Sequence, residues 1–422
     1  ALPNEVVVAE VTRVLPRYLE AKIHRIRKKS RDRVTPRDEY ADIAGGFELE
    51  NLAYQQQLKF KRQVIIDSLE KFQPYGYRNY DVRPTIAAPE EYGYRNKAQF
   101  QIRMVNGKVA AGLYQPNSHT LVDMETCAVQ MPRTMETVRA VTKMIEDLQI
   151  PVYDEKHNSG IIKTLAVRES WSTGEVQLTF ITNSAKLPHK RELLERIEKE
   201  LPAVVSVMQN VNPGDTPLVW GKKMIHLAGK DSILESLMGL DFKLSARSFL
   251  QLNPEQTEVL YEEASKALEL DKDDTLIDAY AGIGTIGLSL ASRVKAVRGM
   301  EIIPEAVADA NENAKLNNIA NAKYEVGKAE EVLPRWQKEG LNFDALVVDP
   351  PRTGLDDQLI KQILKVKPRK FAYVSCGMAS LARNLRRLTS VYHVDYIQPI
   401  DMMPQTASCE AVVKLSLRNG NK

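Results

Sequence analysis

The sequence has few cysteines, no long apolar run and little excess charge. Its three cysteines, Cys127, Cys376 and Cys409, are too few and too far apart for a disulfide framework, which favours reduced thiols and a cytoplasmic protein. No apolar stretch reaches the roughly 18 residues of a membrane span, and no basic start followed by an apolar core marks a signal peptide. We therefore expect a globular protein without a membrane partner, and 422 residues are enough for two or three domains.

The net charge of +3 is unevenly spread along the chain. Residues 1–37 hold ten Lys or Arg against four Asp or Glu, so this segment alone carries +6. A basic segment on an otherwise near-neutral protein predicts attraction to a polyanion, although a solvated charged face would have the same composition. The basic residues singled out for binding such a polyanion are Arg27, Lys28, Lys29 and Arg31.

Periodicity divides the chain into three regions. Residues 1–33 alternate in places and predict a small basic β segment, and residues 34–249 mix short strands with helices, which indicates a central α+β domain. In residues 250–422 strands alternate with helices, which predicts an α/β, doubly wound, Rossmann-like domain. The helices expected before residue 250 are 54–72, 132–148 and 188–200. The strands expected after it are 275–280, 296–302, 345–349 and 371–375.

A glycine turn follows the first of those strands. Gly-Ile-Gly-Thr-Ile-Gly at 282–287 lets the backbone of Gly282 and Gly284 approach a ligand, and the helix that starts there offers free N–H groups. Glu301 ends the next strand, where a ribose partner is expected. This pattern fits NAD or S-adenosylmethionine, and a glycine turn without a ligand is the third interpretation. Asp278 favours the methyl donor, because an acid there can bind the methionine ammonium or nearby loop N–H groups.

Two further strand ends supply a carboxylate and a thiol. Asp349, in Asp-Pro-Pro-Arg, and Cys376 each close an apolar run, and the carboxyl ends of parallel strands meet at one edge of a sheet. A lone cysteine is more often a buried structural residue, but a thiolate at this edge suits addition to C6 of a pyrimidine, which makes C5 nucleophilic. Arg352 stands where adenine-N6 methyltransferases carry an aromatic residue for the flipped base, which argues against that class.

A base must then remove the C5 proton. Glu410 begins a final apolar strand and is the candidate, although a lone Glu at a strand start is usually only solvated. Its neighbour Cys409 has no feature of a nucleophile, and we expect a packed thiol there.

In this order the motifs, with Ser-Phe-Leu-Gln-Leu-Asn-Pro at 248–254 and Asp-Met-Met-Pro-Gln-Thr at 401–406, resemble the RNA uridine-C5 methyltransferases, the group of TrmA, RlmC, RlmD and RlmCD. The resemblance covers nearly the whole chain. It implies S-adenosylmethionine as cofactor, Cys376 as nucleophile, Glu410 as base and packing of helix 54–72 on the C-terminal domain. The other implied or candidate roles are uracil and cofactor contacts of Asp349, cofactor contacts of Gln251, Asp278, Tyr280, Gly282, Gly284 and Glu301, and RNA contacts of Phe249, Arg95 and Lys97.

The chain departs from parts of the family pattern. RlmD-type members bind an iron–sulfur cluster through four cysteines, but the matching segments here read Pro-Arg-Asp at 36–38 and Ala-Gly-Gly-Phe at 44–47, which leaves only Cys127. One thiol cannot hold such a cluster, so we expect no iron–sulfur cluster and no metal. Residues 1–33 are too short for the family's N-terminal TRAM barrel, so we expect that barrel to be either truncated or incomplete in this sequence. Lys328 replaces an acid near the adenine, which leaves that contact open.

A cluster-free, basic, three-part layout most resembles the RlmCD type, so we expect 23S rRNA as the partner. A tRNA uridine-C5 methyltransferase is the second hypothesis. The third is a non-catalytic RNA-binding or chaperone protein with a vestigial cofactor pocket, against which the presence of Cys376, Asp349 and Glu410 argues.

Overall fold

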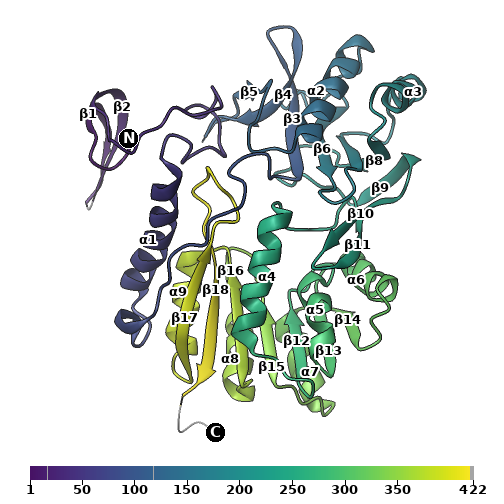
Figure 1. Ribbon diagram of the computed structural model, residues 1–422. Helices are drawn as coiled ribbons and strands as arrows, with labels where there is room; N and C mark the ends of the chain where they lie inside the picture. Colours follow the sequence, from purple (N-terminus) through teal and green to yellow (C-terminus); the bar gives the residue numbers. More distant parts are fainter. Residues whose placement is uncertain (17, 117, 419–422) are drawn as a thin grey trace.

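The computed structural model describes residues 1–16, 18–116 and 118–418. Two seven-stranded sheets, each covered by helices, make up most of the molecule, and a two-stranded N-terminal hairpin stands apart from them (Figure 1). The α/β fold predicted from the sequence is confirmed. Within the described residues, every helix is too short or too polar to cross a membrane.

The N-terminal hairpin pairs β1 (Val6–Val14) with β2 (Leu19–Lys28) in antiparallel register. Most of its side chains are exposed, so two strands alone bury no core. Its base is tied to the following segment by Arg33, whose Nε and Nη2 donate to the Glu5 carboxylate at 2.6 and 3.0 Å. The hairpin therefore presents its basic side chains to solvent.

The first large sheet has the strand order β5-β4-β3-β6-β7-β8-β9. Its strands are antiparallel except for β7 and β8, which the crossover helix α3 joins in parallel. Helices α2 and α3 bury their apolar stripes on one face of the sheet. The elements of this layer are β3 (Lys97–Val105), β4 (Lys108–Tyr114), β5 (Leu121–Asp123), α2 (Pro132–Asp147), β6 (Ile162–Glu169), β7 (Val176–Thr182), α3 (Lys190–Glu200), β8 (Val204–Val211) and β9 (Lys223–Gly229).

The second large sheet has the order β14-β13-β12-β15-β16-β18-β17. All of its strands run parallel except β18, which is antiparallel to both of its neighbours. The carboxyl ends of the parallel strands and the amino end of β18 consequently lie at the same edge. The strands are β12 (Thr275–Ala279), β13 (Ala296–Glu301), β14 (Ala322–Val326), β15 (Ala345–Val348), β16 (Lys370–Ser375), β17 (Tyr392–Ile400) and β18 (Glu410–Leu417).

Helices cover both faces of this sheet and form a separate apolar core on each. Helices α4, α5 and α6 bury one face, together with the hairpin of β10 and β11; α7, α8 and α9 bury the other. Helix α1 comes from far earlier in the chain and packs against α9. These elements are α1 (Tyr54–Phe72), β10 (Ser232–Leu237), β11 (Leu240–Ser245), α4 (Pro254–Leu268), α5 (Thr285–Leu290), α6 (Pro304–Leu316), α7 (Ala329–Lys338), α8 (Asp357–Val366) and α9 (Met378–Leu388).

Tyr324 on β14 explains why glycines surround the cofactor turn. Its ring is buried beneath the turn and its hydroxyl donates to the Gly284 carbonyl at 3.2 Å. A Cβ at Gly287 would lie 2.6 Å from that hydroxyl, and one at Gly299 would overlap the ring itself. Packing against Tyr324 therefore requires glycine at both positions.

We predict that Gly299→Ala destabilises the protein by about 1–3 kcal/mol, because an added methyl group in a filled core forces its neighbours apart. Urea unfolding followed by circular dichroism would measure the loss. Gly45→Ala is the matched control, since a Cβ there meets nothing within 4 Å. Equal unfolding midpoints for the two variants would contradict this account of the turn.

Candidate active site at the carboxyl edge of the second sheet

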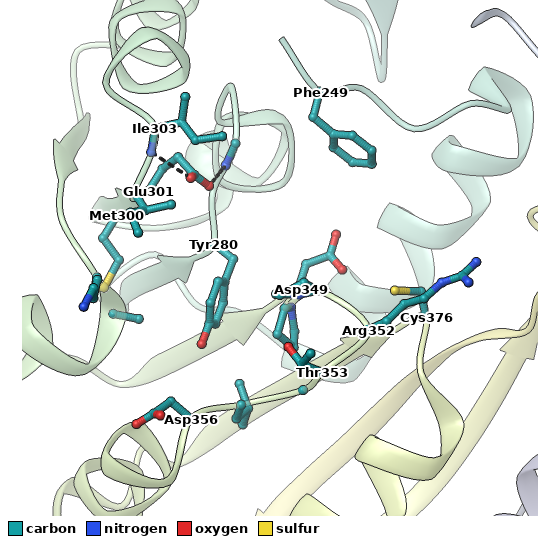
Figure 2. A pocket seen from close by; sticks show the side chains of 18 of the residues that line it. Phe249, Tyr280, Met300, Glu301, Ile303, Asp349, Arg352, Thr353, Asp356 and Cys376 are labelled. Carbon is teal, nitrogen blue, oxygen red and sulfur yellow. Dashed lines mark hydrogen bonds between the residues drawn. The ribbon is translucent and has the colours of Figure 1, made fainter. Parts of the chain in front are cut away.

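A cavity of about 1130 Å³ opens where the parallel strands end. In Figure 2 a row of side chains crosses it from Glu301 through Tyr280 and Asp349 to Cys376. The cavity therefore has two ends: Glu301, suited to a nucleoside, lies at one end, and the Cys376 thiol lies at the other. The sequence-predicted residues that line it are Phe249, Gln251, Tyr280, Gly282, Glu301, Asp349, Cys376 and Glu410.

Glu301 is fixed at the nucleoside end by the backbone. One carboxylate oxygen accepts from the Gly282 N–H at 3.1 Å, and the other accepts from the Ile303 N–H at 3.0 Å (Figure 2). Each oxygen has two acceptor sites, so each keeps one free. A carboxylate held this way fits the two hydroxyl donors of a ribose.

Asp278 and Gly284, both expected to contact the cofactor, do not line the cavity. Asp278 is 1% exposed and accepts the Gly287 N–H at 2.9 Å beneath the turn. Burial raises the pKa of this carboxyl to about 7, with a smaller contribution from Glu301. Of the two kinds of contact considered for an acid at this position, the structure shows one with a backbone N–H, which Gly287 donates from the first turn of α5.

Strand register brings Cys376 and Glu410 to the same point of the edge. Ser375 pairs with Ala411, so the residue after β16 and the residue that opens β18 are neighbours across the ladder. Both line the cavity, with Asp349 from the end of β15. The sequence alone could not show that Cys376 and Glu410 are neighbours in the sheet, because their position depends on the antiparallel direction of β18.

The thiol end is crowded with acidic groups in a poorly solvated space. Burial, followed by the carboxylates of Glu410 and Asp349, raises the pKa of Cys376 to about 11. Burial also raises the pKa of Glu410 to about 7, which Lys61 and Arg352 oppose. The pKa of Asp349 is raised well above its usual value by burial and then by Glu410. The free protein therefore holds Cys376 mainly as a thiol at neutral pH.

Phe249 is an aromatic side chain left in solvent at the cavity mouth. It is 62% exposed, although large apolar residues are normally buried. The residues just before Phe249 are held in place by the buried Arg168, which donates hydrogen bonds to the carbonyls of Ser245 and Ser248. An exposed ring on a fixed loop is suited to stacking on a nucleobase.

The remaining residues predicted for RNA binding lie outside the cavity. Lys97 is the first residue of β3 and Arg95 lies two residues before it; the Lys97 ammonium lies 5.1 Å from the centroid of the Trp220 ring. This segment adjoins the site, because the Asn96 N–H donates to the Leu252 carbonyl at 2.9 Å. The four basic residues of the N-terminal segment, Arg27, Lys28, Lys29 and Arg31, are all exposed, on or just after the hairpin.

Several charged residues of the cavity wall were not predicted from the sequence. Only Asp356 carried a signal, as the N-cap whose carboxylate accepts the Gln358 N–H of α8 at 2.7 Å. The others look like ordinary surface charges in the sequence: Arg247, Arg383 and Arg387.

Within the described chain, no three His, Cys, Asp or Glu side chains are grouped so that they could hold a metal ion. At the positions where related enzymes carry cluster cysteines, Ala44 and Phe47 are packed in the core beside Cys127. Both carboxylate oxygens of Asp38 accept the Ala128 N–H, at 3.1 and 2.9 Å.

We predict that Cys376 is alkylated by iodoacetamide faster than the buried Cys127 and Cys409, with a rate that rises towards a pKa near 11. Glu410→Gln removes a nearby negative charge, so the pKa of Cys376 should fall and its alkylation at pH 8 should accelerate. Mass spectrometry of the digested protein measures each thiol separately. An unchanged or slower reaction in Glu410→Gln would show that this carboxylate does not act on the thiol.

Comparison with known proteins connects this geometry to a family. Residues 222–418 match the family model described as tRNA (Uracil-5-)-methyltransferase. An "uncharacterized RNA methyltransferase" of Lactiplantibacillus plantarum is 61% identical over 99% of this chain and 87% of its own length. Another, from Listeria monocytogenes, is 51% identical over 99% of this chain and 92% of its own length.

A solved structure agrees with these matches over both large sheets. The Pyrococcus abyssi tRNA (uracil-54, C5)-methyltransferase, in complex with S-adenosyl-L-homocysteine, superimposes with a TM-score of 0.78 and 27% identity. The match covers 98% of this chain and 93% of that one. The length and identity of these sequence relatives, together with a thiol and a carboxylate that line one cavity at the sheet edge, lead to one conclusion: the chain belongs to the family of RNA uracil-C5 methyltransferases.

Proposed function

We propose that this protein transfers a methyl group from S-adenosylmethionine to C5 of a uridine in 23S rRNA, through a covalent bond between Cys376 and C6. One observation carries the proposal: Cys376 and Glu410 open into the same cavity as the glycine turn and Glu301. The candidate nucleophile and base for the pyrimidine therefore lie in the same cavity as the residues suited to bind the nucleoside part of the methyl donor.

The cavity residues fit the chemical groups of the methyl donor. Glu301, with both oxygens fixed and each retaining an acceptor site, would bind the ribose hydroxyls, and the apolar side chain of Met300 lines the same end. Gln251 and Asp349 offer polar partners for the amino-acid portion. When bound, the donor supplies an electrophilic methyl group on a cationic sulfur.

Cys376 and Glu410 would then act in sequence. The thiolate forms a bond to C6, and the electron pair of the C5–C6 double bond moves towards O4, which makes C5 able to accept a methyl group. C5 would then form a bond to the donated methyl carbon while the bond from that carbon to the donor sulfur breaks, and Glu410 would remove the C5 proton. The C–H electron pair restores the double bond, the C6–sulfur bond breaks and its electron pair returns to Cys376.

Asp349 is suited to recognise uracil, because burial raises the pKa of its carboxyl group and so shifts it towards the neutral form. A neutral carboxyl offers one donor and one acceptor, which matches the O4 acceptor and N3–H donor of uracil. The same donation to O4 would stabilise the charge that develops there during addition.

The target uridine would have to leave its stack, because C6 must meet a thiol inside a cavity. Exposed Phe249 at the mouth would stack on a base, and the basic N-terminal segment would bind phosphates. The resemblance to cluster-free RlmCD-type enzymes favours 23S rRNA. The family description and the Pyrococcus abyssi relative favour the second candidate, a uridine in tRNA.

Substrate choice can be tested with unmodified RNA from cells that lack the protein. We expect the purified protein to transfer tritiated methyl groups from S-adenosylmethionine to 23S rRNA and not to bulk tRNA, with 5-methyluridine as the product. Label in tRNA alone would establish the second candidate. Label in neither RNA, under conditions where the protein binds the donor, would contradict the proposed reaction.

We predict different failures for two active-site variants. Cys376→Ala should abolish methylation and any covalent RNA complex, because no bond to C6 can form. Glu410→Gln should permit addition and methyl transfer but block loss of the C5 proton, so a methylated protein–RNA adduct should accumulate. Denaturing gels with labelled RNA distinguish the two outcomes. Normal turnover in Glu410→Gln would remove this residue from the mechanism.

A further inference from the structure

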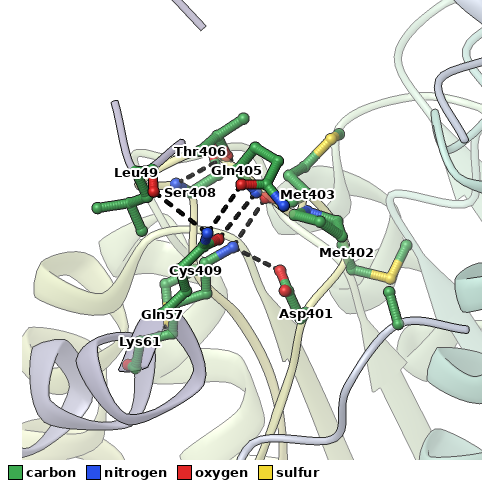
Figure 3. A network of polar contacts seen from close by, with 12 residues as sticks. Leu49, Gln57, Lys61, Asp401, Met402, Met403, Gln405, Thr406, Ser408 and Cys409 are labelled. Atoms are coloured by element: carbon green, nitrogen blue, oxygen red, sulfur yellow. Dashed lines mark hydrogen bonds and ion pairs between the residues drawn. The ribbon is translucent and has the colours of Figure 1, made fainter. Parts of the chain in front are cut away.

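The segment that delivers Glu410 to the active site is a nine-residue connection, residues 401–409, between β17 and β18. Two buried polar residues of α1, Gln57 and Lys61, contact this connection, although they lie about 340 residues earlier in the chain (Figure 3). Both are 0% exposed. Fully buried Lys and Gln side chains are rare and are kept only where their polar groups are satisfied.

Lys61 holds both ends of the connection. Its ammonium donates to the Asp401 carboxylate at 2.5 Å and to the Met403 carbonyl at 2.8 Å. Its own carbonyl accepts from the Cys409 thiol at 3.2 Å, one residue before Glu410. A single residue of α1 thus fixes the start of the connection and the residue next to the proposed base.

Gln57 holds the middle, where the backbone is strained. Gln405 has φ of +69°, in the left-handed region that non-glycine residues rarely adopt. The Gln57 amide binds it twice: its oxygen accepts the Gln405 N–H at 3.0 Å, and its nitrogen donates to the Gln405 side-chain oxygen at 2.8 Å. The Gln405 carbonyl accepts the Leu49 N–H at 3.0 Å, so the backbone N–H, the backbone carbonyl and the side chain of this strained residue all bond to residues 49 and 57.

Lys61 also acts on Glu410 through its charge. Burial raises the pKa of Glu410, and the nearby charge of Lys61 is the strongest influence that lowers it and so favours the ionised form. The other titratable or charged groups that act on Glu410 or feel its charge come from several elements: Arg352, Asp401, Asp349, Cys376, Cys409 and Tyr261. Among these groups only Lys61 and Arg352 are cations.

We propose that Gln57 and Lys61 are positioning residues for the base, and that α1 clamps residues 401–409 so that Glu410 faces C5 of the bound uridine. This inference rests on the proposed function. It assigns a part in proton removal to a helix outside residues 222–418, the portion that matches the family model. Neither residue touches substrate, so both act through Glu410.

The clamp should affect the last chemical step more than the first ones. If it positions Glu410, Lys61→Met and Gln57→Leu slow removal of the C5 proton while addition and methyl transfer continue. Turnover should fall by about 10- to 100-fold, the order that a displacement of about 1 Å can cause. The methylated adduct should rise above its wild-type level. In Lys61→Met the loss of a cation should also shift the acid limb of the pH profile to higher pH, because the proton stays on Glu410 longer.

The experiment follows turnover and adduct together, between pH 6 and 9, on unmodified 23S rRNA and tRNA transcripts with S-adenosylmethionine. Lys59→Met, an exposed residue on the same helix, is the matched control and should behave as wild type. Calorimetric binding of S-adenosylhomocysteine checks that each variant keeps its fold. If Lys61→Met does not fold, Gln57→Leu decides, since it removes hydrogen bonds without unpairing a buried charge.

The outcomes separate this inference from the proposed function. Lower turnover with more adduct supports the clamp. Wild-type turnover in both variants would overturn it, and so would a parallel loss of turnover and adduct, which a merely structural role produces. Absence of methylation and adduct in the wild-type protein would instead refute the proposed function.

Discussion

The site depends on one antiparallel strand in an otherwise parallel sheet. Parallel strands bring only their carboxyl ends to the ligand-binding edge, and β12, β13, β15 and β16 deliver the glycine turn, Glu301, Asp349 and Cys376 in that way. Because β18 runs in the opposite direction, its first residue also reaches that edge. The pairing of Ser375 with Ala411 then sets Glu410 beside Cys376, and a slip of one residue would turn it to the other face.

The same crowding sets the chemistry of the thiol end. Carboxyl groups of Asp349 and Glu410 share a buried space with Cys376, so the pKa of each of the three groups is raised and its negatively charged form is disfavoured. A cationic methyl donor placed in this cavity would act in the opposite direction and lower the pKa of the thiol. On this account the nucleophile becomes ionised mainly when the donor is present, which limits reactions of Cys376 at other times.

Local sequence patterns predicted the α/β architecture and the strand ends well. Helices expected at 54–72 and 132–148 are found at Tyr54–Phe72 and Pro132–Asp147, and the strand ends carrying Asp349 and Cys376 lie where the apolar runs stop. These features are encoded locally, by periodicity and by glycine or proline. The short β14 and the proline-containing α7 were not among the expected elements, because neither has a strong local signal.

Features that depend on contacts between residues far apart in the chain could not be predicted from local sequence patterns. Gln57 and Lys61 look like exposed polar residues of an amphipathic helix, and only contacts about 340 residues away reveal that both are buried. Asp278 was expected at the cofactor, but its burial beneath the turn follows from the packing of α5 and Tyr324. The roles proposed for the cavity residues remain predictions for experiment.

The most direct test of the account is the mass of the covalent complex formed with RNA that contains 5-fluorouridine. Fluorine at C5 cannot be removed as a proton is, so a reaction that passes through C6 addition should stop as a stable adduct. The account predicts a digested peptide that contains Cys376 and carries one fluorouridine nucleotide plus one methyl group. An adduct on Cys409, or methylated RNA released without any adduct, would contradict it.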